Sequence, residues 1–344
     1  MKQESGENSK NIQAGRDVYY GITPTESREI ALDVFKANFY DFSEKASEIA
    51  LKRAEEITDE FIKDFFNSKL NQTKKLENPS VQSAFFNIQK EFAKTGDKYL
   101  KERLIYLLIN RINSKERSLE QICLDEAINI IPKLTIEQIN TLTFIFCTAT
   151  FSDGNLTTLN KFDDFLNHLI SFIPNQKITF SFFRHLTYTG CVSNIEGQKE
   201  NRKLEEIFRN LYPALFVNGF TKEELQNEFG EDLIEIDRII IACLQDNTKY
   251  QFSYLSNERF RKNYKESNLK SYLNKIINFQ DKFIMKPFEI KNFAISRNNK
   301  IIDVFNIWNH EELKTIKLTS VGIAIGIINY NILCDKDLKF NKFI

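Results

Sequence analysis

The chain has 344 residues, and its 47 Lys and Arg balance 47 Asp and Glu, so the formal net charge is zero. Hydrophobic residues make up 42% and charged residues 27%, shares that are typical of globular proteins and exclude wholesale disorder. A neutral chain has no global field that would draw it to nucleic acid or to a membrane. Only 11 Gly and 6 Pro against 31 Phe favour long helices over a turn-rich β architecture.

The cysteines indicate the cellular compartment. Cys123, Cys147, Cys191, Cys243 and Cys334 are odd in number, far apart and mostly flanked by apolar residues. This pattern is typical of buried, reduced thiols rather than of a disulfide framework. The polar start lacks the features of a secretory signal, and no run reaches the ~20 apolar residues that a spanning helix needs. A soluble, cytoplasmic protein is therefore expected.

Residues 1–22 are predicted to be a flexible tail that carries one short strand. From Asn11 onward apolar and polar side chains alternate, as they do in a strand with one buried face. A lone strand leaves its backbone groups and its apolar face without partners. Two partners stay open: the C-terminal sheet of the same chain, or the same strand of a second copy, which we prefer.

Residues 23–75 are predicted to be a long amphipathic helix. Thr23, Pro24 and Glu26 match an N-cap, a first helical residue and a capping-box partner. Apolar residues then recur at helical spacing, which predicts one helix of roughly 45 residues and about 65 Å. A helix of this length exceeds what a compact domain covers, so its apolar stripe is expected to pack on a second copy. The predicted self-association residues are Ile12, Ala14, Val18, Tyr20, Ile22, Ile30, Val34, Phe42, Ile49, Ile57 and Phe61.

Residues 76–255 are predicted to form an α-helical domain. Thr135 with Gln138 is a second capping box that opens a helix, and Gly190 is placed to end another. Further helices are expected over residues 81–95, 98–112, 118–131, 162–173, 178–189, 204–212 and 221–229. Residues 233–244 are apolar enough to be buried.

Residues 256–344 are predicted to form a small α+β domain. After a helix over 269–284, strands are expected at 288–295 and 301–307 as a hairpin, and at 316–318. Thr319 is expected to cap a last helix over residues 320–333. A helix beside a hairpin resembles a winged-helix module. The expected fold class is mainly α, with an N-terminal strand, a long amphipathic helix, a helical body and this winged-helix-like unit.

The same C-terminal domain is basic. It holds 16 Lys or Arg against 9 Asp or Glu, a net charge of +7. Such a surface can neutralise phosphates, and the candidate nucleic-acid contacts are Arg259, Arg261, Lys262, Lys265, Arg297 and Lys300. The alternative is that the acidic run at 223–237 pairs with these cations, between domains or between subunits.

No pattern in the sequence indicates catalysis. His185 and Cys191 are six positions apart, and no second pair stands at metal-ligand spacing. A nucleophile elbow, a phosphate-binding loop, a dinucleotide fingerprint and a zinc-protease helix are all absent. Glu231, Asp232 and Glu235 match no calcium loop and indicate a solvated helix face. Neither a catalytic residue nor a cofactor or metal is therefore predicted, and the chain is not expected to be an enzyme.

Several tracts resemble known families. NSKNIQAGRDVYYGIT and the following EIALDVFKANFYDFSEKASEIALKRAEEITDEF resemble the opening of an uncharacterised bacterial family. AFFNIQKEFAKTGDKYLKERLIYLLINRI, HLTYTGC and LTSVGIAIGIINYN resemble its later landmarks. The order RLIYLLINRI, PKLTIEQINTLTFIF and LTSVG also resembles the abortive-infection alpha proteins, which implies phage defence. None of these likenesses supplies catalytic residues.

The sequence thus predicts a homo-oligomeric cytosolic interaction, scaffold or sensor protein in antiviral defence or prophage-associated conflict. Its expected partners are further copies of itself and a phage component or a neighbouring defence protein. Two alternatives stay open. One is a winged-helix-like nucleic-acid-binding protein, and the other is an effector that perturbs membranes through residues 321–333, although a membrane is the less expected partner.

Overall fold

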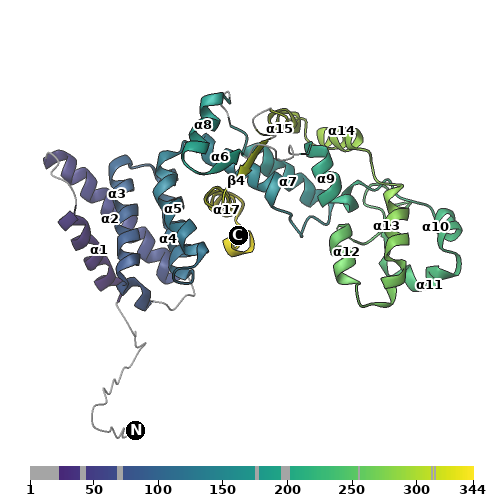
Figure 1. Cartoon of the computed structure of the whole chain (residues 1–344), viewed down its shortest axis with the longest axis horizontal. Helices are drawn as coiled ribbons and strands as arrows, with labels where there is room; N and C mark the ends of the chain where they lie inside the picture. Colours follow the sequence, from purple (N-terminus) through teal and green to yellow (C-terminus); the bar gives the residue numbers. More distant parts are fainter. Residues whose placement is uncertain are drawn as a thin grey trace, which may run out of the picture. The chain divides into compact units, whose positions relative to one another are not determined.

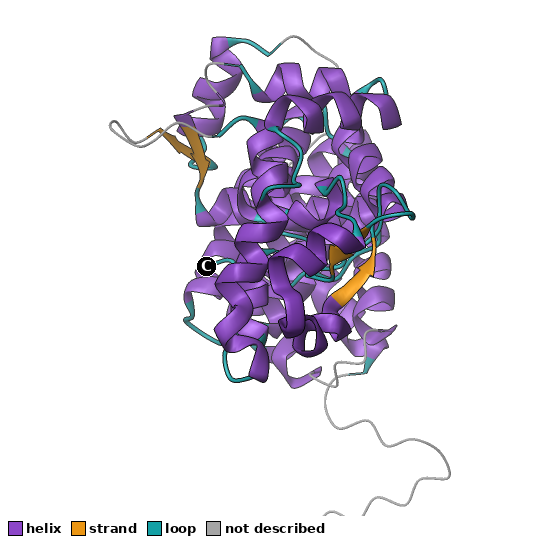
Figure 2. Cartoon of the chain, turned by 90° about the vertical axis from the view of Figure 1, so that its right-hand side faces the viewer, coloured by secondary structure: helices purple, strands orange, loops and turns teal. Residues whose placement is uncertain are grey.

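A computed structural model of the chain describes residues 23–38, 44–67, 73–174, 178–194, 202–254, 256–310, 313 and 315–344. The chain divides into two compact units, with unit 1 ending at Lys133 and unit 2 running from Leu134 to Phe343. Helices dominate both units, and the strands of the described residues form two short antiparallel pairs (Figures 1 and 2). The expectation of a mainly α protein is confirmed.

Unit 1 is built from helices α1 to α5. Thr23 caps α1 as predicted, because its N–H donates to Glu26 Oε2 at 2.9 Å and its Oγ1 accepts from the Glu26 N–H at 3.2 Å. Helices α2 and α3 are antiparallel, and Arg53 Nη1 near the start of α2 donates to the Ala93 carbonyl near the end of α3 at 3.1 Å. The elements are α1 (Pro24–Asn38), α2 (Glu44–Asn67), a 3₁₀ helix (Thr73–Glu77), α3 (Pro79–Thr95), α4 (Lys98–Asn113), α5 (Leu119–Ile130) and a 3₁₀ turn (Ile131–Lys133).

The prediction of one continuous helix from residue 24 to residue 69 is wrong. Arg28 Nε on α1 donates to Asp59 Oδ1 on α2 at 2.6 Å, whereas 31 residues of unbroken helix would separate them by about 46 Å. The two helices therefore pack side by side (Figure 1). The physical reason is burial, since Phe35 of α1 joins Ala50, Ala54 and Ala93 in one apolar cluster. Residues 39–43, like the predicted strand at 11–22, are outside the described residues.

Unit 2 begins with α6, whose capping box of Thr135 and Gln138 is formed as predicted. A π-helical turn at Phe146–Thr150 follows it. The helices are α6 (Ile136–Ile145), α7 (Leu159–Ser171), α8 (Phe180–Tyr188), α9 (Leu204–Leu211), α10 (Lys222–Phe229), α11 (Leu233–Ile236), α12 (Asn257–Asn263), α13 (Leu273–Asp281), α14 (Pro287–Arg297), α15 (Ile301–Trp308) and α17 (Ser320–Cys334). Shorter 3₁₀ segments are Pro213–Phe216, Gly230–Asp232, Asp237–Ile239, Asn268–Tyr272 and Phe340–Lys342.

Helix α17 is a core element of unit 2. The strand before it is confirmed: β4 (Ile316–Leu318) pairs with β1 (Val192–Asn194), with Val192 opposite Leu318. Thr319 then caps α17 by accepting from the Gly322 N–H at 3.2 Å. Asn329 is fully buried and donates to Thr143 Oγ1 of α6 at 2.7 Å.

The membrane-perturbing alternative requires residues 321–333 to be available to a lipid bilayer. Those residues belong to α17, which packs against α6 inside unit 2. Ala324, Ile325, Ile327 and Ile328 are each at most 2% exposed. Over the described ranges, no helix is both long and apolar enough to cross a lipid bilayer.

An aromatic cluster extends across residue 256, where the sequence analysis placed a domain boundary. Phe220 and Phe229 pack against Phe279, with ring centroids 5.0 Å and 5.3 Å apart. Phe252 of β3 (Tyr250–Phe252) and Phe260 of α12 belong to the same buried cluster. β3 pairs with β2 (Ile240–Ala242), with Ile240 opposite Phe252. A boundary at 256 would cut this core in two.

The predicted hairpin at 288–307 is wrong, because both of its strands are the helices α14 and α15. Pro287 opens α14, and the Lys286 N–H donates to Glu289 Oε2 at 2.6 Å. Ile290 and Ala294 are buried at a four-residue step. Ile301, Val304, Phe305 and Trp308 are buried at helical spacing as well. The winged-helix arrangement is therefore not formed.

Candidate functional site

The predicted self-association residues divide between the core and the surface of unit 1. Ile57 and Phe61 are fully buried, and the Phe61 ring centroid is 4.5 Å from that of Phe85. The prediction is wrong for these two, because the other helices of unit 1 already cover this face of α2. Ile30 and Ile49 remain 39% and 52% exposed. Ile12, Ala14, Val18, Tyr20, Ile22 and Phe42 lie outside the described residues.

Ile30 and Val34 belong to an uncharged surface that we call the α1 patch. Its members are Ser27, Ile30, Ala31, Val34, Leu76, Val81, Gln82, Phe85 and Gln89. The hollow in this patch measures only about 20 Å³. Small-molecule sites usually enclose several hundred Å³, so a ligand of that kind does not fit. Six of its members are at most 8% exposed, namely Ser27, Ala31, Leu76, Val81, Phe85 and Gln89. Ile30 and the half-buried Val34 are therefore the apolar side chains that this patch offers to another protein surface.

A buried amide fixes the three helices beneath the α1 patch. Gln89 Nε2 on α3 donates to Thr58 Oγ1 on α2 at 2.9 Å and to the Ala31 carbonyl of α1 at 3.3 Å. Thr58 Oγ1 in turn donates to the Ala54 carbonyl at 2.6 Å. Because buried polar groups are costly when unpaired, this network holds α1 in one position. The α1 patch therefore has a defined shape.

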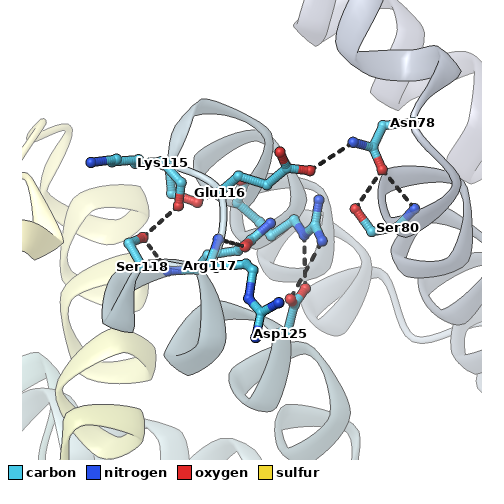
Figure 3. Close-up of polar contacts among 10 residues, drawn as sticks. Asn78, Ser80, Lys115, Glu116, Arg117, Ser118 and Asp125 are labelled. Atoms are coloured by element: carbon cyan, nitrogen blue, oxygen red, sulfur yellow. Dashed lines mark hydrogen bonds and ion pairs between the residues drawn. The ribbon is translucent and has the colours of Figure 1, made fainter.

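A polar surface of unit 1 lies where α3 begins, α4 ends and α5 begins (Figure 3). Asn78 caps α3 through its Oδ1, which accepts from the Ser80 N–H at 2.9 Å. Its Nδ2 donates to Glu116 Oε1 at 2.9 Å. Arg117 has a φ of +53°, and its N–H donates to Gln121 Oε1 at 2.6 Å. These bonds fix the α4–α5 connection against α3.

Arg111 lies between two hollows of this polar surface, of about 160 Å³ and 230 Å³. It is 4% exposed, and its Nε donates to Asp125 Oδ1 at 2.8 Å. Lys75 Nζ donates to the Ile112 carbonyl at 2.7 Å, and Ser118 caps α5. Arg111, Lys75 and both helix starts are thus engaged within the unit. We assign this network a structural role in holding α3, α4 and α5 together.

Four of the predicted nucleic-acid contacts lie together on or just after α12. Arg259, Arg261, Lys262 and Lys265 are all exposed. Arg261 Nη1 donates to Asn274 Oδ1 at 2.6 Å, which anchors it to α13. This group keeps its positive charge at the surface.

The other two predicted contacts are separated from α12 in the fold. Arg297, at the end of α14, forms a bidentate ion pair with Asp163 of α7, in which Nε and Nη2 each donate to one carboxylate oxygen. These hydrogen bonds raise the pKa of Arg297. Asn298 Nδ2 next to it donates to Asn167 Oδ1 at 2.9 Å. This corner therefore joins α14 to α7, whereas Lys300 beyond it is exposed and its contact with nucleic acid stays a prediction.

The acidic run pairs with basic residues of the same chain. Lys275 Nζ is 3.2 Å from Asp232 Oδ2, and Lys282 Nζ is 2.9 Å from Glu228 Oε2. Both pairs join α13 to the α10–α11 region within unit 2. Charge complementarity between the two segments thus acts inside one chain. Each pair is partly exposed, so its contribution to stability is small.

The outer side of α8 carries a surface that the sequence analysis missed, and we call it the α8 face. Phe180, Arg184 and Tyr188 follow one another at four-residue steps, and the two rings are 65% and 86% exposed. The Arg184 guanidinium lies 5.7 Å from the Phe180 ring centroid. The opposite side of the helix buries Phe183 and Leu186. The sequence did carry a signal for this surface. Phe180 and Tyr188 are spaced to share one side of the helix, and that side differs from the one that Phe183 and Leu186 occupy.

A pocket of about 430 Å³ adjoins the α8 face. It is lined by Phe180, Phe183, Arg184, Thr187, Tyr188, Thr315 and Ile316. None of these residues is acidic. Arg184 is the single charged group of this lining, and it makes no ion pair with any part of the chain that the structure describes.

The thiols of Cys147, Cys191 and Cys334 are protonated at neutral pH. Burial raises the pKa of Cys191 to about 11 and that of Cys334 to about 12, and it raises the pKa of the fully buried Cys147 well above its ordinary value. A nucleophilic cysteine needs the thiolate form, so these thiols are suited to packing. His185, six residues before Cys191, lies with its Nδ1 3.1 Å from Gln138 Oε1. Within the described ranges no three His, Cys, Asp or Glu side chains are grouped to hold a metal ion.

The fold and these surfaces define a mainly helical protein of two compact units. A protein-family model matches residues 21–344, and the chain belongs to that family, to which no activity is assigned. The expectation of an uncharacterised family is confirmed. The bacterial origin of that family, the tracts quoted for it and the likeness to abortive-infection proteins stay predictions. No curated protein and no solved structure matches the chain.

Proposed function

We propose that this protein is a self-associating interaction protein whose copies meet through the α1 patch. The observation that carries the proposal is the exposed Ile30 in a patch without charged members, on helices that Gln89 holds in place. A contact across a two-fold axis brings the same surface of both copies together. An uncharged apolar patch can do so without opposing like charges, and the contact would cover exposed apolar area.

A charge introduced into the α1 patch tests this proposal. The wild-type chain is expected to show a mass above that of the monomer in size-exclusion chromatography with light scattering. Ile30→Asp is expected to weaken the association at least tenfold, because an unpaired carboxylate would be buried in an apolar contact. Its unfolding temperature should stay close to that of the wild type, because Ile30 is 39% exposed.

Thr25→Asp is the matched control, since it adds the same charge to an exposed position of the same helix outside the patch. It is expected to leave the mass unchanged. A wild-type chain that is monomeric at every concentration, or an Ile30→Asp variant with the wild-type mass, would show that the α1 patch is not a contact between copies.

The role that we propose for the assembly is antiviral defence or prophage-associated conflict, with a phage component or a neighbouring defence protein as partner. Sequence resemblance alone supports this part. Cells that express the protein are expected to show at least about tenfold fewer plaques with one or more phages, and Ile30→Asp should restore plaque formation if assembly is required. Equal plaque counts with and without the gene across a broad phage panel would count against it.

A further inference from the structure

We propose that the α8 face binds single-stranded nucleic acid. The observation behind this is the order of groups along the helix, with an exposed ring at Phe180, a cation at Arg184 and an exposed ring at Tyr188. Four helical residues rise about 6 Å, so the backbone of Arg184 lies midway between those of Phe180 and Tyr188, which are about 12 Å apart along the axis. An unpaired strand likewise alternates flat bases with anionic phosphates.

The chemistry of the lining matches such a strand. Bases stack on aromatic rings without regard to sequence, and an arginine between them neutralises a phosphate. Among the described residues that line the pocket beside the face, none carries a carboxylate that would repel the backbone. Arg184 has no ion-pair partner among the described residues, so its charge is available to a ligand.

The arrangement fits a nucleic acid better than a protein partner. The centre of a protein interface is usually a continuous, well-packed apolar area that is poor in charge. On the α8 face the centre is the cation, and the two rings stand apart on either side of it. The pocket volume of about 430 Å³ leaves room for a base beside the rings.

The α8 face is held in place by the helix next to it. Gln138 of α6 donates through Nε2 to the Phe182 carbonyl at 3.2 Å, and its Oε1 is 3.1 Å from His185 Nδ1. Phe183 and Leu186 anchor the inner side of α8 in the core. Binding would therefore cost little ordering of the protein, because the rings are displayed on a fixed helix.

The test is fluorescence anisotropy of the full chain with labelled single-stranded DNA and RNA of about 12 nucleotides. Phe180→Ala and Tyr188→Ala are each expected to weaken binding about tenfold, in line with the loss of one stacked base. Arg184→Gln should reduce the salt dependence by about one phosphate contact. Tyr188→Phe keeps the ring and should bind like the wild type. All three positions are exposed at the surface, and circular dichroism will confirm that each variant folds.

Phe288→Ala is the matched control, because Phe288 is a 61% exposed ring on α14, away from the α8 face. It is expected to leave binding unchanged. Double-stranded DNA of the same length should bind more weakly, since its bases are already stacked.

Three outcomes would overturn the proposal. One is the absence of binding to any single strand, and a second is binding that the α8 variants leave unchanged but that Arg259→Ala, Arg261→Ala and Lys262→Ala together abolish. The third is tighter binding of an acidic peptide than of any oligonucleotide, with loss in the same α8 variants, because this would make the α8 face a protein-binding site.

Discussion

Replacement of Phe61 by alanine is expected to lower the free energy of unfolding by about 3–5 kcal/mol. The Phe61 ring is fully buried, and its centroid lies 4.5 Å from that of Phe85 and 5.5 Å from that of Phe65. Truncation would remove buried apolar area and leave a cavity that the packed helices α2 and α3 cannot close. Urea unfolding of the full chain measures the loss, and hydrogen exchange in peptides from α2 and α3 locates it in unit 1.

Ile49→Ala on the same helix is the control for this prediction. Ile49 is 52% exposed, so its truncation should cost less than about 1 kcal/mol. Equal losses for the two variants would show that Phe61 is not the core residue described here. The comparison thus separates a core member of the predicted self-association stripe from an exposed member of the same stripe.

Gly322→Ala is expected to cost about 3 kcal/mol or more. A Cβ at this position would lie 2.0 Å from the Cys191 carbonyl oxygen and 3.0 Å from the Cys191 carbonyl carbon. Both atoms belong to the backbone, so the start of α17 and the end of α8 would have to separate. The Thr319 N–H donates to this same carbonyl at 3.1 Å, and the separation would weaken that bond as well. Thermal unfolding followed by circular dichroism measures the effect.

Gly190→Ala is the matched control in the same corner of unit 2. Gly190 has a φ of +72°, and no atom lies within 4 Å of the position of its absent Cβ. Alanine there adds only left-handed backbone strain, about 1–2 kcal/mol. If Gly322→Ala destabilised the chain no more than Gly190→Ala, the close approach of α17 to Cys191 would not hold in solution.

The local signals in the sequence were reliable. Thr23 with Glu26 and Thr135 with Gln138 form the capping boxes predicted for them, and Thr319 caps the last helix. Such caps are hydrogen bonds between residues about three positions apart, so the residues that decide them are adjacent in the sequence. The strand at 316–318 was also correct, although its partner β1 is more than a hundred residues away.

The errors arose where two local patterns competed. In PFEIKNFAISR apolar residues fit both alternation and helical spacing, and the helix prevails because Ile290 and Ala294 face the core at a four-residue step. The fold-back of α1 on α2 has no Gly or Pro signal at all between Pro24 and Pro79. It is driven by the burial of Phe35 and by the long-range contacts of Gln89, which no window of neighbouring residues contains.

By itself the sequence determined the helical class and the capped helix starts at Thr23, Thr135 and Thr319, because these depend on neighbouring residues. Only the tertiary structure decided which apolar side chains are core and which are surface. Ile30 and Phe61 lie on the same predicted stripe, yet one is exposed and the other is fully buried. Phe180 and Phe183 differ in the same way on α8. Burial is decided by helices that arrive from distant parts of the chain, and among the described residues those helices leave Ile30, Phe180 and Tyr188 exposed.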